Sequence, residues 1–347
     1  MAGKKPRVSV IIATLNEEAF IERALRSVFE GTLPPDEVEA VVADGGSCDR
    51  TREVVLNLAQ TYPNIRLVEN PRRIAPCGFN AAIKATRADV IALLSAHCYV
   101  DPNYLEVCLR ALEETGADVS SGVEVALPPD DSLQARLATA VLGSRFGVGL
   151  SFRTAHKEGP VDAVCFPVYR RTAFERVSLY DERLVRNQDN ELTGRVRASG
   201  GVVWLTPKTR GYYYGRGTIA GLMKQNYRNG LYAVLNWRIT PASFSVRHMI
   251  PFLFVLFLLA GAALSFVHPW LVLGYAAVLG LYVLLDVASA IQLVVRHRRA
   301  AMLLTIPIFP LLHIAYGVGT LVSFFRFGLT RIPDQKPEKL APRPAEE

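Results

Sequence analysis

Residues 8–49 read VSVIIATLNEEAFIERALRSVFEGTLPPDEVEAVVADGGSCD, and this stretch decides the fold. It contains two continuous apolar runs of strand length, at residues 8–13 and 38–43. Such runs are typical of parallel strands that are covered on both faces. The residues between them have the apolar spacing of a helix, with one face formed by Ile21, Leu25, Val28 and Phe29. We therefore expect a βαβ unit, whose helix begins after an N-cap at Asn16 and ends at Gly31.

Polar residues follow both predicted strands at their carboxyl ends. They are Thr14, Asn16 and Glu17 after the first strand, and Asp44, Gly45, Gly46 and Ser47 after the second. Open α/β sheets bind ligands at this edge. A carboxylate beside two glycines can accept hydrogen bonds from a base N–H or a ribose hydroxyl. The alternative is a tight turn in which Ser47 caps the next helix, and the residues alone favour neither interpretation of Asp44.

The following segments alternate between strand and helix patterns. We expect further strands at residues 65–68, 90–94, 119–125, 161–169 and 202–205. We expect helices at residues 49–60, 79–86, 102–115, 132–142 and 187–199. Residues 143–159 are glycine-rich and suit a lid. This order of strands and helices predicts an α/β fold with a doubly wound, mostly parallel sheet. The sequence contains neither a G-x-G-x-x-G fingerprint nor a P-loop.

Apolar residues are concentrated in the last third of the 347-residue chain, of which 50% is hydrophobic. Three apolar segments, at residues 250–267, 270–295 and 301–325, approach or exceed the ~18–20 residues that span a bilayer. Residues 219–237 mix apolar and basic side chains, as in an amphipathic helix at the membrane interface. We therefore divide the chain into a sheet domain at 1–215, interface helices at 216–249, a small transmembrane helix bundle at 250–326 and a polar tail at 327–347.

The formal net charge of +7 is unevenly distributed. Residues 193–285 contain no Asp or Glu, and their basic residues favour an anionic lipid bilayer or a diphosphate as partner. We expect no nucleic acid, because no recognisable binding motif is present. Residues 1–7 are basic without an apolar run, so we expect no cleavable signal. With basic residues 296–299 on the inner side, the pattern predicts a multi-pass protein of the inner (plasma) membrane with a cytosolic sheet domain.

The side on which the tail lies is open at this stage. Three full spans would place it outside, whereas its Arg and Lys residues favour the cytosol. Pro307 and Pro310 interrupt the third apolar segment, which would then be broken or re-entrant. The pattern slightly favours three spans.

Asp189 stands in an acidic and amide cluster, Gln188, Asp189, Asn190 and Glu191, at the start of a predicted helix. If it faces the same sheet edge as Asp44, it could take a proton from an attacking hydroxyl. The alternative is a helix N-terminus that bears acids for dipole and capping reasons.

Five short motifs occur in one order ahead of the apolar segments: VSVIIATLNEE, VVADGGSCDRT, ALLSAHCYVDP, NQDNELTGRVRASGG and KQNYRNG. In this combination the chain resembles glycosyltransferase family 2, whose membrane-associated members have a GT-A fold. The resemblance covers roughly residues 7–325 and is strongest to the branch of succinoglycan-type exopolysaccharide enzymes.

The resemblance implies roles for several residues. Asp44 would hold the uracil and ribose of a nucleotide sugar, and Thr14, Asn16, Glu17 and Ser95 would line the same pocket. His97 stands at the last position of the family's D-x-D motif, near the diphosphate and a divalent cation, Mn²⁺ or Mg²⁺. Asp189 would be the general base. Gln225 and Arg228 would border the acceptor and the diphosphate.

Three positions depart from the family pattern. Ser95-Ala96-His97 has neither aspartate of D-x-D, and imidazole suits Mn²⁺ or Zn²⁺ better than Mg²⁺. A cation ligand and a hydrogen-bonded structural residue are both open for His97. Gln188 replaces the glutamate before the base, and Asn229 stands where a tryptophan follows the arginine of the Q-x-x-R-W motif.

The resemblance implies inverting transfer from a nucleoside diphosphate sugar, which we expect to be a UDP-sugar. The acceptor would be a hydroxyl of a polyprenyl-diphosphate-linked saccharide in exopolysaccharide or glycan assembly. Two alternatives stay open: transfer to a polyprenyl phosphate, which needs no general base, and a non-catalytic membrane scaffold with the same sheet.

Overall fold

The computed structural model describes residues 5–149, 157–264, 266–332 and 336–341. A nine-stranded sheet forms the centre of the amino-terminal part, in the order β3-β2-β1-β4-β8-β6-β9-β5, with β7 paired to β9. The strands are β1 (Val8–Thr14), β2 (Val38–Asp44), β3 (Ile65–Glu69), β4 (Val90–Leu93), β5 (Cys98–Val100), β6 (Val119–Leu127), β7 (Gly159–Pro160), β8 (Val168–Arg170) and β9 (Val203–Tyr214).

Strand direction divides the sheet into two halves. β1 pairs in parallel with β2 and with β4, and β2 pairs in parallel with β3. Beyond β4 the sheet is mixed, because β8 runs antiparallel to both β4 and β6 while β6 and β9 are parallel. The predicted doubly wound α/β sheet is confirmed, and its antiparallel strands are confined to the second half.

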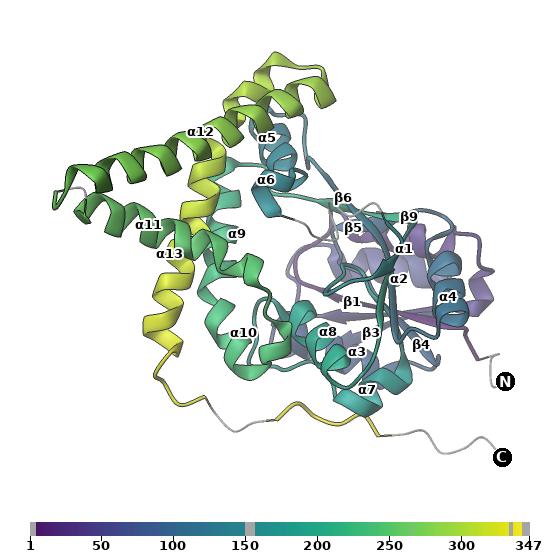
Figure 1. Ribbon diagram of the computed structural model, residues 1–347. Helices are drawn as coiled ribbons and strands as arrows, with labels where there is room; N and C mark the ends of the chain where they lie inside the picture. Colours follow the sequence, from purple (N-terminus) through teal and green to yellow (C-terminus); the bar gives the residue numbers. More distant parts are fainter. Residues whose placement is uncertain (1–4, 150–156, 265, 333–335, 342–347) are drawn as a thin grey trace.

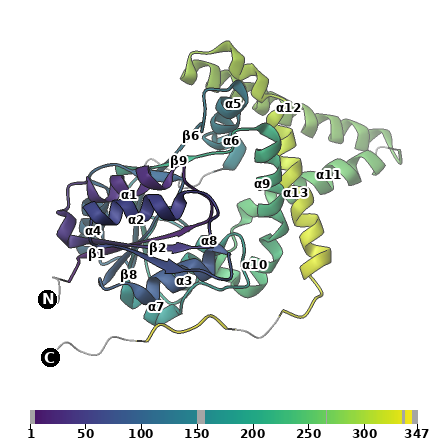
Figure 2. The same cartoon turned by 180° about the vertical axis from the view of Figure 1, so that it is seen from behind.

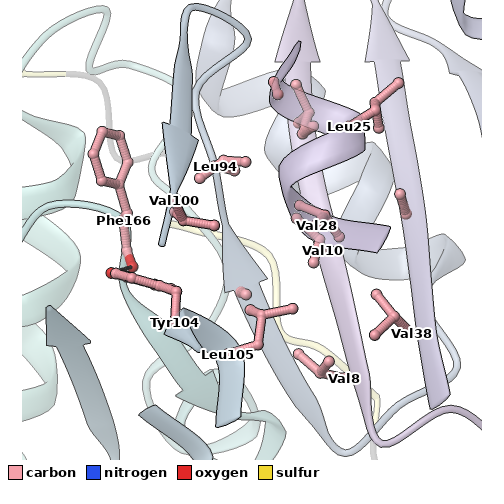
Figure 3. Close-up of a cluster of buried hydrophobic side chains, with 14 of the residues drawn as sticks. Val8, Val10, Leu25, Val28, Val38, Leu94, Val100, Tyr104, Leu105 and Phe166 are labelled. Atoms are coloured by element: carbon pink, nitrogen blue, oxygen red, sulfur yellow. Dashed lines mark hydrogen bonds between the residues drawn. The ribbon is translucent and has the colours of Figure 1, made fainter. Parts of the chain in front are cut away.

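Helices cover both faces of the sheet (Figures 1 and 2). One face is covered by α1 (Ile21–Phe29), α2 (Thr51–Thr61) and α4 (Tyr104–Thr115), and the other by α3 (Ala75–Ala85), α7 (Arg171–Val177) and α8 (Gln188–Ala198). Successive residues of β1 point to opposite faces, so Val10 and Ile12 join the first core and Ile11 the second. Figure 3 shows the first core, in which Leu25 and Val28 of α1 lie over Val10 of β1.

Several predicted boundaries are wrong for identifiable reasons. Asn16 is not an N-cap: α1 begins at Ile21, and Asn16 has a left-handed backbone (φ 55°) while its side chain accepts a hydrogen bond from the Cys48 amide. Most of residues 161–169 forms no strand, because Phe166 (φ 52°) interrupts the extended backbone. The alternation there reflects burial, since Val164 and Phe166 lie in the two cores.

The predicted helix at residues 219–237 is two helices, α9 (Ile219–Leu231) and α10 (Ala233–Ile239), which meet at Tyr232. The remaining helical elements are α5 (Leu133–Leu142), α6 (Arg145–Val148), α11 (Ile250–Leu264), α12 (Pro269–His297), α13 (Ile308–Phe327) and four 3-10 turns, η1 (Pro35–Glu37), η2 (Pro241–Ser243), η3 (Val246–His248) and η4 (Ala300–Thr305). The predicted lid at residues 143–159 contains α6 and in part lies outside the described residues.

Two helical stretches are long and apolar enough to cross a membrane: Pro269–His297 and Ala300–Phe327. α11 is apolar too, but it has only 15 residues. α11 and α12 project together from the rest of the molecule, while α13 runs beside α9 (Figure 1). The number of membrane crossings stays a prediction.

The tail returns to the sheet domain along the side of α7 (Figures 1 and 2). The Leu179 amide donates a hydrogen bond to the Glu338 carbonyl at 2.8 Å, and the Lys84 Nζ lies 2.6 Å from the Glu338 carboxylate. Leu340 is buried in the second core. The end of the chain therefore contributes to the same core as β1 and β2.

Glycines allow α9 and α13 to cross with their backbones in contact. A Cβ atom at Gly319 would clash with the Tyr227 carbonyl oxygen, and one at Gly230 would clash with the Tyr316 carbonyl oxygen. Only glycine fits where two helix backbones approach this closely. The crossing thereby fixes the distance between α9 and the apolar helices.

We expect Gly319→Ala to separate these helices and to lower the free energy of unfolding by about 1–3 kcal/mol, as overpacking does in a tight core. Thermal unfolding in detergent measures this as a lower Tm. Gly280→Ala on α12 is the matched control, because a Cβ atom there meets nothing within 4 Å. Equal Tm values for the two variants would show that the crossing does not need glycine.

Candidate functional site

The carboxyl ends of β1, β2 and β3 lie at one edge of the sheet. In the parallel register Thr14 is opposite Asp44, and Asp44 is opposite Glu69. The loops that follow β1 and β2 are joined by hydrogen bonds: the Ser47 hydroxyl accepts one from the Asn16 amide at 2.9 Å, and the Thr51 hydroxyl accepts one from the Glu17 amide at 2.8 Å. The structure therefore brings four of the predicted site residues to one edge of the sheet: Thr14, Asn16, Glu17 and Asp44.

Asp44 is fully buried and strongly hydrogen-bonded. Its carboxylate accepts bonds from the Gly46 amide at 3.1 Å, from the amide and hydroxyl of Ser47, and from the Arg52 guanidinium at 2.8 Å. Burial alone would raise the pKa of this carboxyl, but the bonds from Ser47 and Arg52 hold the pKa below its ordinary value. Asp44 thus stabilises the turn as an anion, and its role toward a nucleotide stays a prediction.

Ser95 and His97 follow β4 and reach the same edge. The His97 Nδ1 lies 3.0 Å from the Glu17 Oε1, and the Ser95 hydroxyl lies 3.3 Å from the His97 Nε2. Glu17, Ser95 and His97 therefore form one polar group. Its donors suit a divalent cation in part, because one imidazole nitrogen and one carboxylate face each other and such a mixed pair fits Mn²⁺ better than Mg²⁺.

Aromatic side chains of β5 and β9 lie beside this group, and the sequence pattern did not single them out. Tyr213 makes an edge contact with the His97 ring at 5.2 Å between centroids. Tyr99 stacks on Tyr212 at 4.7 Å, and the Arg23 guanidinium lies over the Tyr99 ring at 3.7 Å. The run GYYY at residues 211–214 is the signal that could have indicated these rings.

Asp189 lies in the first turn of α8, and its Oδ1 is buried without a hydrogen-bond partner among the described residues. Burial, and to a smaller extent the nearby Glu124 carboxylate, together raise its pKa from 3.8 to about 6. A capping aspartate would accept an amide hydrogen bond with this oxygen. The observed geometry therefore favours a chemical role over the capping alternative.

The loop before α8 connects Asp189 to α9. The Asn187 side chain donates a hydrogen bond to the Asn229 carbonyl at 3.1 Å, and Asn187 has a left-handed backbone with φ 60°. Gln225 accepts a hydrogen bond from the Arg216 Nε at 3.0 Å, and Arg228 is exposed one turn further along α9. The loop that ends two residues before Asp189 thus contacts α9, the helix that contains Gln225 and Arg228.

Tyr213 and Arg186 link the two polar regions. Tyr213 contacts His97 on one side and lies within electrostatic range of Arg186, three residues before Asp189, on the other. Among the described residues no direct contact joins Asp44 to Asp189. The predicted residues Asp44, Glu17 and His97 therefore lie at one edge, and Tyr213 and Arg186, which were not predicted, connect this edge with the loop before Asp189.

Comparison of the sequence with known proteins identifies the family to which the chain is related. The model of glycosyl transferase family 2 matches residues 9–178. The chain is 32% identical over 249 residues to the succinoglycan biosynthesis protein ExoA of Rhizobium meliloti, and the match covers 70% of this chain and 73% of that protein. It is 25% identical over 259 residues to a dolichyl N-acetyl-alpha-D-glucosaminyl phosphate 3-beta-D-2,3-diacetamido-2,3-dideoxy-beta-D-glucuronosyltransferase of Methanococcus voltae, covering 73% of this chain and 80% of that enzyme.

A solved structure has a similar fold. It is the mannosyltransferase PcManGT of Pyrobaculum calidifontis in complex with GDP-Man and Mn²⁺, with a TM-score of 0.61 at 20% identity. The similarity covers 92% of this chain and 88% of that one. At this identity the likeness shows the fold alone.

Replacing Asp189 should reveal the free energy cost of its burial. A raised pKa means that the folded state disfavours the carboxylate, so the cost is fully present above about pH 6 and absent below about pH 4. We expect Asp189→Asn to raise the free energy of unfolding by about 1–2 kcal/mol at pH 8, a value reduced for partial exposure.

Thermal unfolding of both proteins across this pH range tests the expectation, and the gain should vanish at about pH 4. Asp131→Asn is the control, because its side chain is 97% exposed. A gain that does not change with pH would contradict the assigned cause.

Proposed function

The chain belongs to glycosyltransferase family 2, and from this premise we propose that it transfers a sugar, with inversion, from a nucleoside diphosphate sugar to a hydroxyl of a lipid-linked saccharide. The observation that carries the proposal is the Asp189 carboxylate, whose buried Oδ1 has no partner among the described residues. A carboxylate with a free lone pair and a pKa near 6 can accept a proton at neutral pH.

The proposed chemistry is a single displacement. Asp189 takes the proton of the acceptor hydroxyl, the oxygen bonds to the anomeric carbon, and the bond from that carbon to the nucleoside diphosphate breaks. The electron pair of this bond leaves with the diphosphate, so negative charge grows there and cationic side chains stabilise it. Arg228, at the exposed end of α9, is one such side chain.

The donor would lie along the carboxyl edge of β1, β2 and β4. The buried Thr14 hydroxyl has no hydrogen-bond partner among the described residues, which supports a ligand contact at this position. A similarly folded mannosyltransferase is in complex with GDP-Man, and we propose a nucleotide sugar here too, with a UDP-sugar as first choice. Asp44 and Ser95 would contribute to the nucleotide pocket.

We further propose that a divalent cation, if used, binds to His97 and Glu17 and takes its remaining ligands from the donor diphosphate. Among the described residues no group of three or more His, Cys, Asp or Glu side chains gathers around a common point, so the protein supplies an incomplete set. When bound, the cation would neutralise charge on the leaving group.

The acceptor is proposed to be a polyprenyl-diphosphate-linked saccharide in exopolysaccharide or related glycan assembly. Two relatives support it by name, one in succinoglycan biosynthesis and one that acts on a dolichyl-linked sugar phosphate. α9 packs directly against the apolar α13, so an acceptor whose lipid tail is in the bilayer could reach Asp189 beside α9. Anionic headgroups would complement the acid-free basic segment.

The membrane topology that we propose follows from the position of the tail, which packs on the sheet domain. Leu340 is buried in the sheet domain, so the tail and that domain would lie on the same, cytosolic side of the inner membrane. This requires an even number of membrane crossings.

We expect Asp189→Asn to reduce turnover with hydroxyl acceptors by at least about a hundredfold, as loss of a general base does, while the Kd of the nucleotide sugar stays unchanged. The kcat/KM of the wild type should fall as the pH drops below about 6, because Asp189 is then protonated. Purified protein, a panel of nucleotide sugars and membrane lipid extract supply the assay, with mass spectrometry of the product lipids.

Near-normal turnover of Asp189→Asn would favour the alternative in which a polyprenyl phosphate, already ionised, is the acceptor. Absence of nucleotide-sugar binding by the wild type, with and without Mn²⁺ or Mg²⁺, would favour the non-catalytic scaffold.

The topology has its own test. A green fluorescent protein fused after residue 347 should fluoresce in cells, and an alkaline phosphatase fused at the same position should be inactive, because both report a cytosolic tail. The reverse pair of results would require an odd number of crossings and would contradict the contact of Leu340 with the sheet domain.

A further inference from the structure

Glu191 is the second carboxylate in the first turn of α8, two positions after Asp189, and it is fully buried. Its oxygens accept hydrogen bonds from the Arg195 Nε at 2.6 Å and from the Arg195 Nη2 at 2.8 Å, which makes a bidentate ion pair within one helix. The Thr240 hydroxyl donates a further bond to the Glu191 Oε1 at 2.7 Å. We call these three side chains, Glu191, Arg195 and Thr240, the Glu191 clamp.

The remaining donors of Arg195 hold the loop between α7 and α8. Its Nη1 donates to the carbonyls of Val177 and Ser178, and its Nη2 donates to the Leu179 carbonyl at 2.8 Å. Together with the bonds to Glu191, these contacts use every N–H donor of the guanidinium. The planar fork of an arginine can make this set of contacts, whereas a lysine could not.

Thr240 connects α8 to the segment that follows α10. It is buried, and its carbonyl accepts bonds from the Ser243 amide at 2.9 Å and from the Ser243 hydroxyl at 2.6 Å in η2. Gly194, three positions after Glu191, lies so close that a Cβ atom there would be 2.7 Å from the Ser243 backbone. Three positions further along, the Arg197 Nη2 donates to the Ala242 carbonyl at 2.6 Å. One face of α8 is therefore docked on η2 and on the residue before it.

The two acids in the first turn of α8 have different surroundings. Glu191 is fully buried and bonded to neighbouring protein groups, so an acceptor hydroxyl has no access to it. Asp189 is half-buried, and its Oδ1 has no hydrogen-bond partner among the described residues. The arrangement therefore assigns a structural task to Glu191 and leaves Asp189 available for chemistry.

We propose that Glu191, Arg195 and Thr240 are positioning residues for the general base, because they fix the first turn of α8 relative to α10. α10 packs against the apolar α13, so the clamp also fixes the position of Asp189 relative to the apolar helices. A misplacement of about 1 Å can reduce a catalytic rate about a hundredfold, so this position matters. The inference rests on the proposed function for the identity of the base.

Thr240→Val tests the clamp, because it keeps the shape of the side chain and removes the bond to Glu191. We expect kcat with the lipid-linked acceptor to fall about tenfold, since the base is displaced, while the KM of the nucleotide sugar stays unchanged. Thr240→Ser keeps the hydroxyl and should restore the wild-type kcat. Thr305→Val is the matched control, because this buried threonine of η4 donates to the Met302 carbonyl at 2.7 Å.

A double-mutant comparison separates positioning from a general loss of folded protein. If Thr240 acts through the base, Thr240→Val should cause no further loss of kcat in an Asp189→Asn background. A merely structural role would lower turnover by the same factor in both backgrounds. Equal factors, or a wild-type kcat of the Thr240→Val single variant, would overturn the proposal.

Hydrogen exchange of the purified full chain in detergent tests the clamp without turnover. The amides of residues 188–195 should exchange faster in Thr240→Val than in the wild type, because the start of α8 is held less firmly. They should exchange at the wild-type rate in Thr305→Val. Wild-type exchange of this segment in Thr240→Val would contradict the clamp.

Failure of the proposed function would look different. Wild-type turnover of Asp189→Asn would show that this residue is not the base, and faster exchange of α8 in Thr240→Val would then still support the clamp. Loss of turnover in Asp189→Asn, together with wild-type kcat and exchange in Thr240→Val, would leave the base assigned and overturn the clamp.

Discussion

The parallel register of β1 with its two neighbours is the constraint on which the rest of the structure depends. It sets Thr14 opposite Asp44 and brings the end of β4 to the same edge, so that residues from three separate segments become neighbours. Parallel strands require crossover helices, and the two layers of helices bury both faces of the sheet. Hydrogen bonds between the loops after β1 and β2 keep the polar edge in a defined shape.

A second coupling joins this edge to the apolar helices. α8, which contains Asp189, packs against η2, where a Cβ atom at Gly194 would meet the Ser243 backbone at 2.7 Å, and its preceding loop is bonded to α9. α9 in turn crosses α13 with backbone contact at Gly319. Each of these contacts leaves little room for adjustment, because protein interiors are packed as densely as crystals. The distance from the candidate base to the apolar helices is therefore built into the fold.

The sequence predicts those features whose physics is local. The apolar runs of β1 and β2, the edge positions of Thr14 and Asp44, and the family motifs are all readable from spacing and residue type. Other features depend on tertiary contacts. Asn16 is a residue type that often caps helices, yet here its side chain joins two loops by a hydrogen bond with the Cys48 amide. Phe166 lies in a stretch with the apolar spacing of a strand, yet its left-handed backbone forms none. The contact of the loop before α8 with α9 could not be predicted, because it depends on a hydrogen bond from Asn187 to the Asn229 carbonyl, 42 positions further along the chain.

The candidate site contains one electrostatic cost that several other carboxylates of the domain avoid. The Asp189 Oδ1 is buried without a hydrogen-bond partner among the described residues, and burial together with the nearby Glu124 raises the pKa of this carboxyl. Elsewhere Asp44, Asp181 and Glu191 each have an arginine partner, so the fold is able to pair such charges. Asp189 and Arg186 are only three positions apart, and the chain nevertheless keeps them unpaired. A direct ion pair with an arginine would hold the Asp189 carboxylate ionised, whereas burial without such a partner raises its pKa and leaves it able to accept a proton.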